Sequence, residues 1–468
     1  MSKSSRDYVV LINSVLAALA TAFLAGYLSD VPREAAFMIG IFVLAALLWV
    51  TEALPLFATA LLVIGLEIVL LANPGNWTGF GFESDTSPSM KQILHAAADP
   101  VLVLFFGGFL LAQAAVKEGV DKAMSSLLLR PFGSKPLWIM LGLMLVTALF
   151  SMWMSNTATT AMMITLVVPM LAQMPGKDPF RKALVLCVPF AANIGGMGTP
   201  IASPPNAVAV GFLQKANLQV GFLEWMLLAS PLVLALLLFT WFLLWKIFAP
   251  VDRNLRIELT SHAVTPRGWF VVSVFVLTAF LWMTDRWHGY PAAAVALLPA
   301  VALTASGILN RNDLNSLEWN ILILIAGGIA LGAGIQMTGL DQIIVNWLPL
   351  SGGGVMLLLV ILVLATIVFG TFMSNTAAAN LILPIGISSA AFLDHGDGVI
   401  KQVAIGIALA ASASMALPIS TPPNAISYAH GEVSTRDMAI AGSIIGALAA
   451  VLIILFSGPV MRLWGLSN

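Results

Sequence analysis

Long apolar runs, separated by short polar segments, extend along almost the whole chain. They fall at about 8–28, 35–50, 55–72, 100–116, 136–174, 183–213, 221–249, 268–284, 290–308, 319–340, 354–393, 400–430 and 438–461. Because a helix of about 20 apolar residues spans a bilayer, most runs predict one membrane helix each. Three runs, at 136–174, 354–393 and 400–430, are too long for one crossing, and Gly and Pro interrupt the run at 183–213. The pattern predicts an all-α polytopic membrane protein.

The distribution of Lys and Arg predicts how these helices are oriented, since cytoplasmic loops of membrane proteins carry an excess of both. If the runs at 136–174 and 354–393 are hairpins that enter and leave the bilayer on one side, the other runs make eleven crossings. The alternation then places 15 of the 21 Lys and Arg residues on the side of the N-terminus and six on the other side. We therefore expect a cytoplasmic N-terminus and an extracytoplasmic C-terminus.

The composition agrees with a chain that lives in lipid. Only 9% of the 468 residues are charged and 59% are hydrophobic, whereas about a quarter of the residues in a soluble domain are charged. This balance excludes a soluble enzyme. The formal net charge of −1, without a basic run, excludes nucleic acid as a partner, and the single Cys187 excludes an internal disulfide or a cysteine metal cluster.

Three motifs occur twice, in the same order, in the two halves of the chain, at offsets of 220, 219 and 218 residues. The pairs are 106–108 with 326–328 (Phe-Gly-Gly and Ala-Gly-Gly), 154–158 with 373–377 (both Met-Ser-Asn-Thr-Ala), and 203–207 with 421–425 (Ser-Pro-Pro-Asn-Ala and Thr-Pro-Pro-Asn-Ala). Such an ordered set indicates an internal duplication. An odd number of predicted crossings separates the two Gly-Gly copies, so the halves have opposite orientations, as is typical of secondary transporters.

The duplication divides the chain into an N-terminal helix, two inverted repeats and a linker between them. The predicted bounds are 1–33 for the helix, 34–249 for the first repeat, 250–267 for a cytoplasmic linker and 268–468 for the second repeat. Each repeat holds a re-entrant hairpin, at about 136–174 and 354–393, and a broken helix, at about 183–213 and 400–430.

Each Ser-Asn-Thr motif lies in the middle of an apolar run, where a re-entrant hairpin would have its tip. Backbone turns at this depth are tolerated only when they are buried in protein or line a wet cavity. Thr157 and Thr376 would begin the second helix of each hairpin, where free N–H groups and the positive end of the macrodipole attract an anion. The Ser and Asn of both motifs add neutral donors for a carboxylate and oxygens for a cation.

The two Pro-Pro-Asn motifs follow segments that unwind a helix, at 193–200 and 413–421. Each predicts exposed carbonyls beside a new helix N-terminus, a combination that suits Na⁺. The segments 137–174, 183–213, 355–393 and 403–428 contain no Asp, Glu, Lys or Arg. Anion binding there must therefore rest on helix ends and hydroxyls, with bound cations offsetting the charge.

Two Ser-Asn-Thr hairpin tips, each followed by an unwound helix ending in Pro-Pro-Asn, make the whole chain resemble the divalent anion/sodium symporter (DASS) family, which includes sodium-coupled di- and tricarboxylate transporters. The resemblance implies eleven transmembrane helices plus two re-entrant hairpins, with a scaffold domain and a transport domain that moves as an elevator. It also implies a homodimer in an inner or plasma membrane that carries C4-type dicarboxylates such as succinate, malate, fumarate or 2-oxoglutarate together with Na⁺.

The resemblance further implies which residues form the site. Those that would contact or enclose the substrate are Ser155, Asn156, Thr157, Ser374, Asn375, Thr376, Thr199, Thr421 and Pro422. The first sodium site would use Ser151, Ser155, Asn156 and the backbone at Gly198, and the second would use Asn375 with backbone near Met373 and Ala416. The sequence departs from the pattern at Gly370, which stands where Ser151 stands in the first half, so the second site lacks a hydroxyl unless Thr371 supplies it.

Several alternatives remain open at this point. Some relatives exchange dicarboxylates without sodium, so an exchanger competes with a symporter, and a carrier of sulfate or another inorganic divalent anion competes with both. A channel and a membrane enzyme fit the sequence less well, because helices are broken in both halves and no nucleophile, metal set or acid/base pair appears. We interpret Gly107 and Gly327 as sites of close helix packing, and the buried carboxyl of Glu67 as either structural or part of a pathway.

Overall fold

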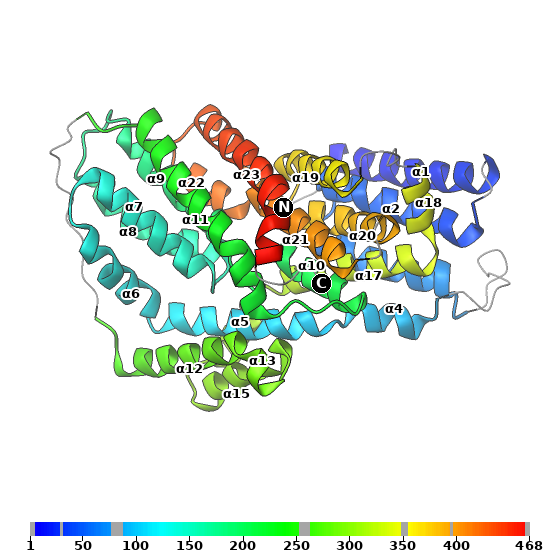
Figure 1. Cartoon of the computed structure of the whole chain (residues 1–468), viewed down its shortest axis with the longest axis horizontal. Helices are drawn as coiled ribbons and strands as arrows, with labels where there is room; N and C mark the ends of the chain where they lie inside the picture. The colour runs from blue at the N-terminus through cyan, green and yellow to red at the C-terminus, as the bar shows by residue number, and fades with distance from the viewer. Residues whose placement is uncertain are drawn as a thin grey trace.

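The computed structural model of the chain describes residues 5–28, 31–75, 88–251, 263–347, 354–393 and 396–463. All regular secondary structure in these residues is helical (Figure 1), as predicted. Among them, nine helices are long and apolar enough to cross a membrane. The number of crossings, the bounds of the repeats and the side on which each terminus lies stay predictions, and most of the predicted linker, 252–262, lies outside the described residues.

Among the described residues, eleven α-helices and two short helices of other types come before residue 250. They are α1 (Ser5–Leu28), α2 (Arg33–Thr51), α3 (Leu56–Leu66), the π-helix η1 (Glu67–Ala72), α4 (Met90–Ala97), α5 (Pro100–Lys117), α6 (Val120–Leu129), the 3₁₀-helix η2 (Arg130–Phe132), α7 (Pro136–Ser151), α8 (Asn156–Ala172), α9 (Phe180–Gly195), α10 (Pro204–Lys215) and α11 (Phe222–Ile247), followed after residue 262 by α12 (Pro266–Met283). The predicted helix at 55–72 thus ends in a π-helical turn, and α4 extends the predicted helix at 100–116 towards the N-terminus.

The remaining helices repeat much of this order. They are α13 (Asp285–His288), α14 (Ala292–Val295), α15 (Leu297–Ala305), α16 (Arg311–Asn315), α17 (Trp319–Met337), α18 (Leu340–Trp347), α19 (Gly354–Phe372), α20 (Asn375–Leu393), α21 (Asp397–Ala413), α22 (Pro422–Tyr428) and α23 (Thr435–Leu463). The single helix predicted at 290–308 is interrupted near Ala296, where α14 gives way to α15.

Both predicted hairpins are present as pairs of packed helices. In the first, α7 ends at Ser151 and α8 begins at Asn156, and in the second, α19 ends at Phe372 and α20 begins at Asn375. Ser155 interrupts the first pair because its extended backbone lets its hydroxyl accept from the Ala158 N–H at 3.2 Å, as an N-cap does. The Ser-Asn-Thr motifs therefore form the hairpin tips.

Both predicted broken helices are present as well, and their halves are exchanged between the two parts of the molecule. The second piece of the first broken helix, α10, packs against α20 and α21, while α22, the second piece of the other, packs against α8 and α9. In Figure 1, α7, α8, α9 and α22 accordingly lie together at one end, and α10, α20 and α21 lie together beyond the centre. The exchange brings both unwound segments to the middle of the molecule.

Reciprocal contacts of small residues join the two halves. A Cβ atom on Gly107 would lie 2.5 Å from the Ala296 carbonyl oxygen, and a Cβ atom on Gly327 would collide with Ala60. These contacts pack α5 on the α14–α15 segment and α17 on α3, which agrees with the interpretation of both glycines as packing sites. Two buried tryptophans, one in each half, make the same kind of bond to the backbone that follows them. Trp49 donates its indole N–H to the Leu56 carbonyl, and Trp282 donates its indole N–H to the Ala292 carbonyl.

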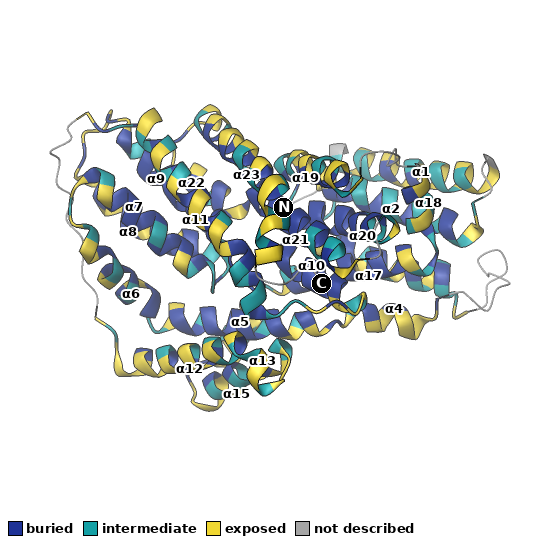
Figure 2. Cartoon of the chain, in the orientation of Figure 1, coloured by how far each residue is buried: buried dark blue, intermediate teal, exposed yellow. Residues whose placement is uncertain are grey.

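Ion pairs connect loops that the predicted alternation puts on the same side of the membrane. The pairs between distant segments are Lys117 with Asp313, Arg181 with Glu432, Lys182 with Asp437 and Arg286 with Glu224. Each joins two segments of the same predicted side, so the fold is compatible with the alternation. Figure 2 shows that burial differs among the helices: α1 and α12 are largely exposed, whereas α17 and α20 lie in the interior.

Candidate functional site

A cavity of about 680 Å³ lies where the two hairpin tips and the two broken helices meet. Eight of the nine residues predicted to contact the substrate line it: Ser155, Asn156, Thr157, Ser374, Asn375, Thr376, Thr421 and Pro422. The fold thus brings together residues that are more than 200 positions apart in the sequence. The assignment of these residues to a substrate stays a prediction, but their meeting in one cavity is a property of the fold.

The start of α8 shows how a hairpin tip can bind an anion. Ser155 caps the helix and occupies the Ala158 N–H, while the N–H groups of Asn156 and Thr157 precede the first intrahelical acceptor and remain available. They lie at the positive end of the helix macrodipole. The start of α20 lines the cavity with the same three residue types, so the cavity has two similar poles, one from each hairpin.

One asparagine holds each unwound segment in place. The amide nitrogen of Asn206 donates to the carbonyls of Gly196 (2.9 Å) and Thr199 (2.8 Å). The amide nitrogen of Asn424 likewise donates to Met415 (2.8 Å) and Leu417 (2.9 Å). These are the asparagines of the two Pro-Pro-Asn motifs, and both side chains are fully buried. Each one bridges the gap between the two pieces of its broken helix.

The broken helices also bond to each other across the centre. The Asn193 amide donates to the Thr421 hydroxyl at 3.1 Å, and the hydroxyls of Ser203 and Ser412 lie 3.2 Å apart. Ser412 occupies in the second half the place of Asn193 in the first, at the offset of 219, and Thr421 occupies that of Ser203. The two bonds are therefore counterparts, and all four residues line the cavity.

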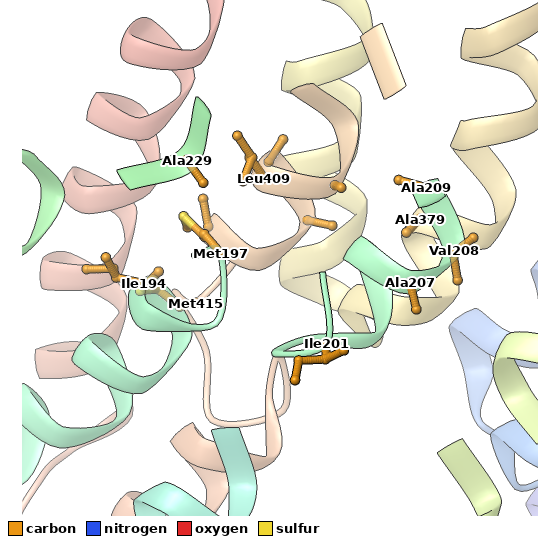
Figure 3. Close-up of a cluster of buried hydrophobic side chains, with 14 of the residues drawn as sticks. Ile194, Met197, Ile201, Ala207, Val208, Ala209, Ala229, Ala379, Leu409 and Met415 are labelled. Atoms are coloured by element: carbon orange, nitrogen blue, oxygen red, sulfur yellow. The ribbon is translucent and has the colours of Figure 1, made fainter. Parts of the chain in front are cut away.

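The first unwound segment is packed among apolar side chains on its other face. Met197 is fully buried, and its carbonyl accepts the indole N–H of Trp225 at 3.0 Å. Figure 3 shows Ile194, Met197 and Ile201 along the path from α9 to α10, within a cluster of buried hydrophobic side chains. This packing and the asparagine bridge fix backbone that no helix holds.

Thr199 differs from its predicted role of closing the pocket, because it is not among the residues that line the cavity. Its hydroxyl donates instead to the Met152 carbonyl at the first hairpin tip. In the second half Ser420 donates to the Thr371 carbonyl at 2.8 Å, at the position that corresponds to Met152. Both hydroxyls therefore attach an unwound segment to a hairpin tip.

The residues predicted for the first sodium site lie close together. The Ser151 hydroxyl oxygen is 2.7 Å from the Asn156 side-chain oxygen and 2.8 Å from the Ala192 carbonyl. Gly196 and Gly198 have no room for side chains, since a Cβ atom would collide with Asn156 at the former and lie 2.8 Å from Met152 at the latter. The loop backbone therefore approaches the hairpin tip closely enough to share a small ion with it.

The second predicted site is built differently. The Thr371 hydroxyl donates to the Ile367 carbonyl of its own helix at 2.7 Å. Met373 and Ala416 are both buried, as their predicted backbone roles require. The Asn375 side-chain oxygen is buried and has no hydrogen-bond partner among the described residues.

Two carboxyl groups line the cavity that the sequence analysis did not identify. Glu52 and Glu318 are both present, and the described lining residues include no Lys, Arg or His. Glu318 precedes α17, and its carboxyl lies near the Ser155 side chain of the hairpin tip. Glu52 ends α2 with a left-handed backbone (φ 51°), which is uncommon for a residue of this type. A position at the edge of an apolar run is their only signal in the sequence: Glu52 follows one such run and Glu318 precedes another.

Glu67, the deeply buried carboxyl whose role the sequence left open, does not belong to this cavity. It lies at the start of η1, fully buried against Gly334. Among the described residues neither of its carboxyl oxygens has a hydrogen-bond partner.

Comparison with known proteins identifies transporters throughout. The chain matches the citrate transporter family over residues 46–400 and 279–465. It is 32% identical over 428 residues to an uncharacterized transporter of Haemophilus influenzae, covering 87% of this chain and 88% of that protein. It is 29% identical over 467 residues to the sodium-dependent dicarboxylate transporter SdcS of Staphylococcus aureus, covering 91% of this chain and 86% of SdcS.

Fungal relatives are longer than this chain. It is 30% identical over 393 residues to the inorganic phosphate transporter PHO87 of Saccharomyces cerevisiae, covering 81% of this chain and 41% of PHO87. It spans 50% of an uncharacterized transporter of Schizosaccharomyces pombe. The Alcanivorax borkumensis YdaH transporter shares the fold, with a TM-score of 0.60 at 14% identity over 91% of this chain and 100% of that one.

These matches, together with the nine apolar helices of the described residues, establish a multi-pass membrane transporter. The extent of the family match and the paired motifs agree with the resemblance noted from the sequence. The chain belongs to the citrate transporter family, a DASS-like family of membrane transporters.

Proposed function

We propose that the chain is a secondary active transporter that carries C4-type dicarboxylates together with Na⁺. The observation that carries this proposal is the charge of the central cavity, which is lined by two anion-binding helix starts and two glutamates but, in its described lining, by no basic side chain. A dicarboxylate could place one carboxylate at each of the two helix starts, those of α8 and α20. Bound cations would then offset its two negative charges. The sodium-dependent dicarboxylate transporter among the relatives supports the same choice.

The need for cations follows from the size of the charges. A helix N-terminus acts as roughly half a positive charge, and the starts of α8, α20, α10 and α22 line the cavity. Their sum, about two charges by that estimate, at most matches a doubly charged substrate, and Glu52 and Glu318 supply no positive charge. α10 also begins with two prolines, which supply no N–H donors. Bound Na⁺ would therefore strengthen substrate binding, and the substrate would strengthen Na⁺ binding.

We further propose that the hairpins and broken helices move as an elevator against a scaffold and that the transporter works as a homodimer. The extensive packing of α7–α10 and α19–α22 on one another supports a common moving body. The exposed apolar faces of helices such as α1 and α12 leave room for lipid or a second protomer.

Uptake into proteoliposomes tests the proposed function. Labelled succinate should accumulate saturably when an inward Na⁺ gradient is present, and replacing Na⁺ by choline should reduce the initial rate strongly. Uptake that ignores Na⁺ but requires dicarboxylate inside the vesicle would identify an exchanger instead. A complete lack of succinate uptake, by protein that is folded and inserted, would refute the proposed substrate class.

A carrier of inorganic anions is a second candidate, because one relative is an inorganic phosphate transporter. Two poles on separate hairpins favour a substrate with two separated carboxylates over a compact anion with one charge centre. Competition decides between them: excess succinate should suppress uptake of labelled substrate, whereas phosphate or sulfate at the same concentration should not. The reverse order of inhibition would favour the second candidate.

A further inference from the structure

The two predicted sodium sites differ in the source of a hydroxyl group. In the first half, Ser151 on hairpin helix α7 places its hydroxyl 2.7 Å from the Asn156 side-chain oxygen. Its counterpart at the offset of 219 is Gly370 on α19, which has none. The neighbouring Thr371 hydroxyl is directed back to the carbonyl of Ile367. Gly370 therefore offers Asn375 no counterpart of the Ser151 hydroxyl, and among the described residues the Asn375 side-chain oxygen accepts no hydrogen bond from Thr371.

The space left by Gly370 is filled from another helix. A Cβ atom on Gly370 would lie 2.6 Å from the hydroxyl oxygen of Ser414 and 3.5 Å from the side-chain oxygen of Asn375. Ser414 is the C-cap of α21 and is 1% exposed. Its hydroxyl thus lies against the position that the Cβ of a serine at residue 370 would take, a position that is also close to the Asn375 side-chain oxygen.

The first half shows the reverse arrangement. Ser414 corresponds there to Gly195 or Gly196, depending on where the one-residue difference between the unwound segments falls. A Cβ atom on Gly195 would lie 2.5 Å from the backbone of Ala148, and one on Gly196 would collide with the Asn156 amide. One half therefore combines a hairpin serine with a broken-helix glycine, and the other combines a hairpin glycine with a broken-helix serine.

We propose that Ser414 supplies the hydroxyl ligand of the second sodium site, in place of the hairpin residue that supplies it in the first. This inference rests on the sodium coupling proposed above. The Ser414 O–H is 3.0 Å from the Ala410 carbonyl, to which it donates, so the lone pairs of its oxygen are free to bind a cation. The unpartnered Asn375 oxygen and the carbonyls at the C-terminal end of α21 complete an oxygen-rich site at the negative end of a helix macrodipole.

Sodium titration of succinate uptake tests this role. Ser414→Ala should raise the half-saturating Na⁺ concentration at least about tenfold, as loss of a supporting oxygen does at metal sites, while the succinate KM at saturating Na⁺ stays near that of the wild type. Thr366→Val is the matched control, because Thr366 is an equally buried hydroxyl on α19 that bonds within its own helix, to Leu362 at 2.6 Å. This control should keep the wild-type sodium dependence.

A swap variant separates ligation from folding. Gly370→Ser alone should lose uptake, since its side chain collides with Ser414, whereas Gly370→Ser combined with Ser414→Gly recreates the arrangement of the first half. The double variant should recover a half-saturating Na⁺ concentration within about threefold of the wild type, well inside the tenfold effect expected for a lost ligand. Stabilisation of the purified protein by NaCl relative to choline chloride, measured without substrate, should follow the same order.

The outcomes are distinct for the two proposals. Wild-type uptake without Na⁺ stimulation would refute the sodium coupling itself, and Ser414 ligation with it. Sodium-dependent wild-type uptake with an unchanged half-saturating Na⁺ concentration in Ser414→Ala would overturn the role of Ser414 alone. If Ser414→Ala does not fold, the double variant decides: recovery of the sodium dependence supports the swap, and failure to recover it refutes the swap.

Discussion

Replacing Asn424 by alanine should both destabilise the protein and impair uptake. The Asn424 side chain makes three hydrogen bonds: its amide nitrogen donates to the carbonyls of Met415 and Leu417, and its oxygen accepts from Asn193 at 3.1 Å. The side chain is fully buried. Alanine leaves two carbonyls and one amide donor without partners in the centre of the molecule, at the unwound segment that carries Ala416.

The size of the effect follows from these three bonds. A buried polar group that loses its partner costs about 1–3 kcal/mol, and carbonyls near a cavity can recruit water, which favours the lower limit. The expected loss is therefore about 3 kcal/mol or somewhat more. Asn206→Ala removes only the two bonds to Gly196 and Thr199, so its loss should be smaller by about 1 kcal/mol, the net value of one hydrogen bond.

Thermal unfolding of the purified protein, followed by tryptophan fluorescence, measures this order, and proteoliposome uptake measures the functional loss. Asn424→Asp provides the shape control: it keeps the size of the side chain but cannot donate to either carbonyl, so it should be as damaging as alanine. A cycle with Asn193→Ala should give a coupling of about 1 kcal/mol with Asn424→Ala. An unfolding temperature and an uptake rate equal to the wild type in Asn424→Ala would refute the reasoning.

Three further predictions concern other parts of the molecule. Asn156→Ala and Asn375→Ala should each abolish succinate uptake, because both residues line the cavity. Expression and unfolding temperature should stay near those of the wild type, since the Asn375 oxygen accepts no hydrogen bond among the described residues and Ser151 keeps the Ala192 carbonyl as an acceptor; normal uptake by both variants would refute the placement of the site. Gly327→Val should destabilise the protein by about 1–3 kcal/mol or more, and so lower its yield and unfolding temperature, because a Cβ atom at this position would collide with α3. Gly65→Ala should have no such effect, since Gly65 has open space around it. Equal behaviour of the two variants would contradict the packing role of Gly327. The ion pair with Arg181 on α9 lowers the pKa of Glu432 from its ordinary value of 4.5, so the pair stabilises the fold above that pH and loses its effect as the pH falls through the lowered pKa. The difference in unfolding temperature between the wild type and Glu432→Gln should therefore disappear over that acidic range. A difference that stays constant with pH would exclude this contribution.

The sequence predicts the elements of this fold well because each prediction depends on a pattern within one segment. An uncharged apolar run with a capping serine in its middle specifies a hairpin, and the predicted hairpin at 354–393 coincides with the described ends of α19 and α20. The broken helices follow in the same way from Gly and Pro before Asn206 and Asn424. The fold then brings both tips to one cavity.

Contacts between segments were less accessible from the sequence. The family resemblance implies that Thr199 closes the pocket, but an unwound segment needs bonding partners, and the Thr199 hydroxyl donates to the backbone at Met152. Glu318 lies outside every repeated motif, so only the fold reveals that it lines the same cavity as Ser155. The exchange of a hydroxyl between Gly370 and Ser414 is invisible in each segment alone, because it depends on which helix approaches the hairpin.

The exchanged halves of the broken helices constrain how the transporter can move. α10 continues the first half but packs on the hairpin of the second, and α22 does the opposite. Moving one hairpin and its packed helices without the other would break the bonds of Asn206 on α10 with Gly196 at the end of α9, and of Asn424 on α22 with Met415 after α21, leaving buried polar groups without partners. We therefore expect both hairpin tips to move together, which keeps the two poles of the cavity at a constant spacing. A substrate recognised by that spacing would be recognised equally on both sides of the membrane, and net transport would then depend on the gradients of the ions bound with it.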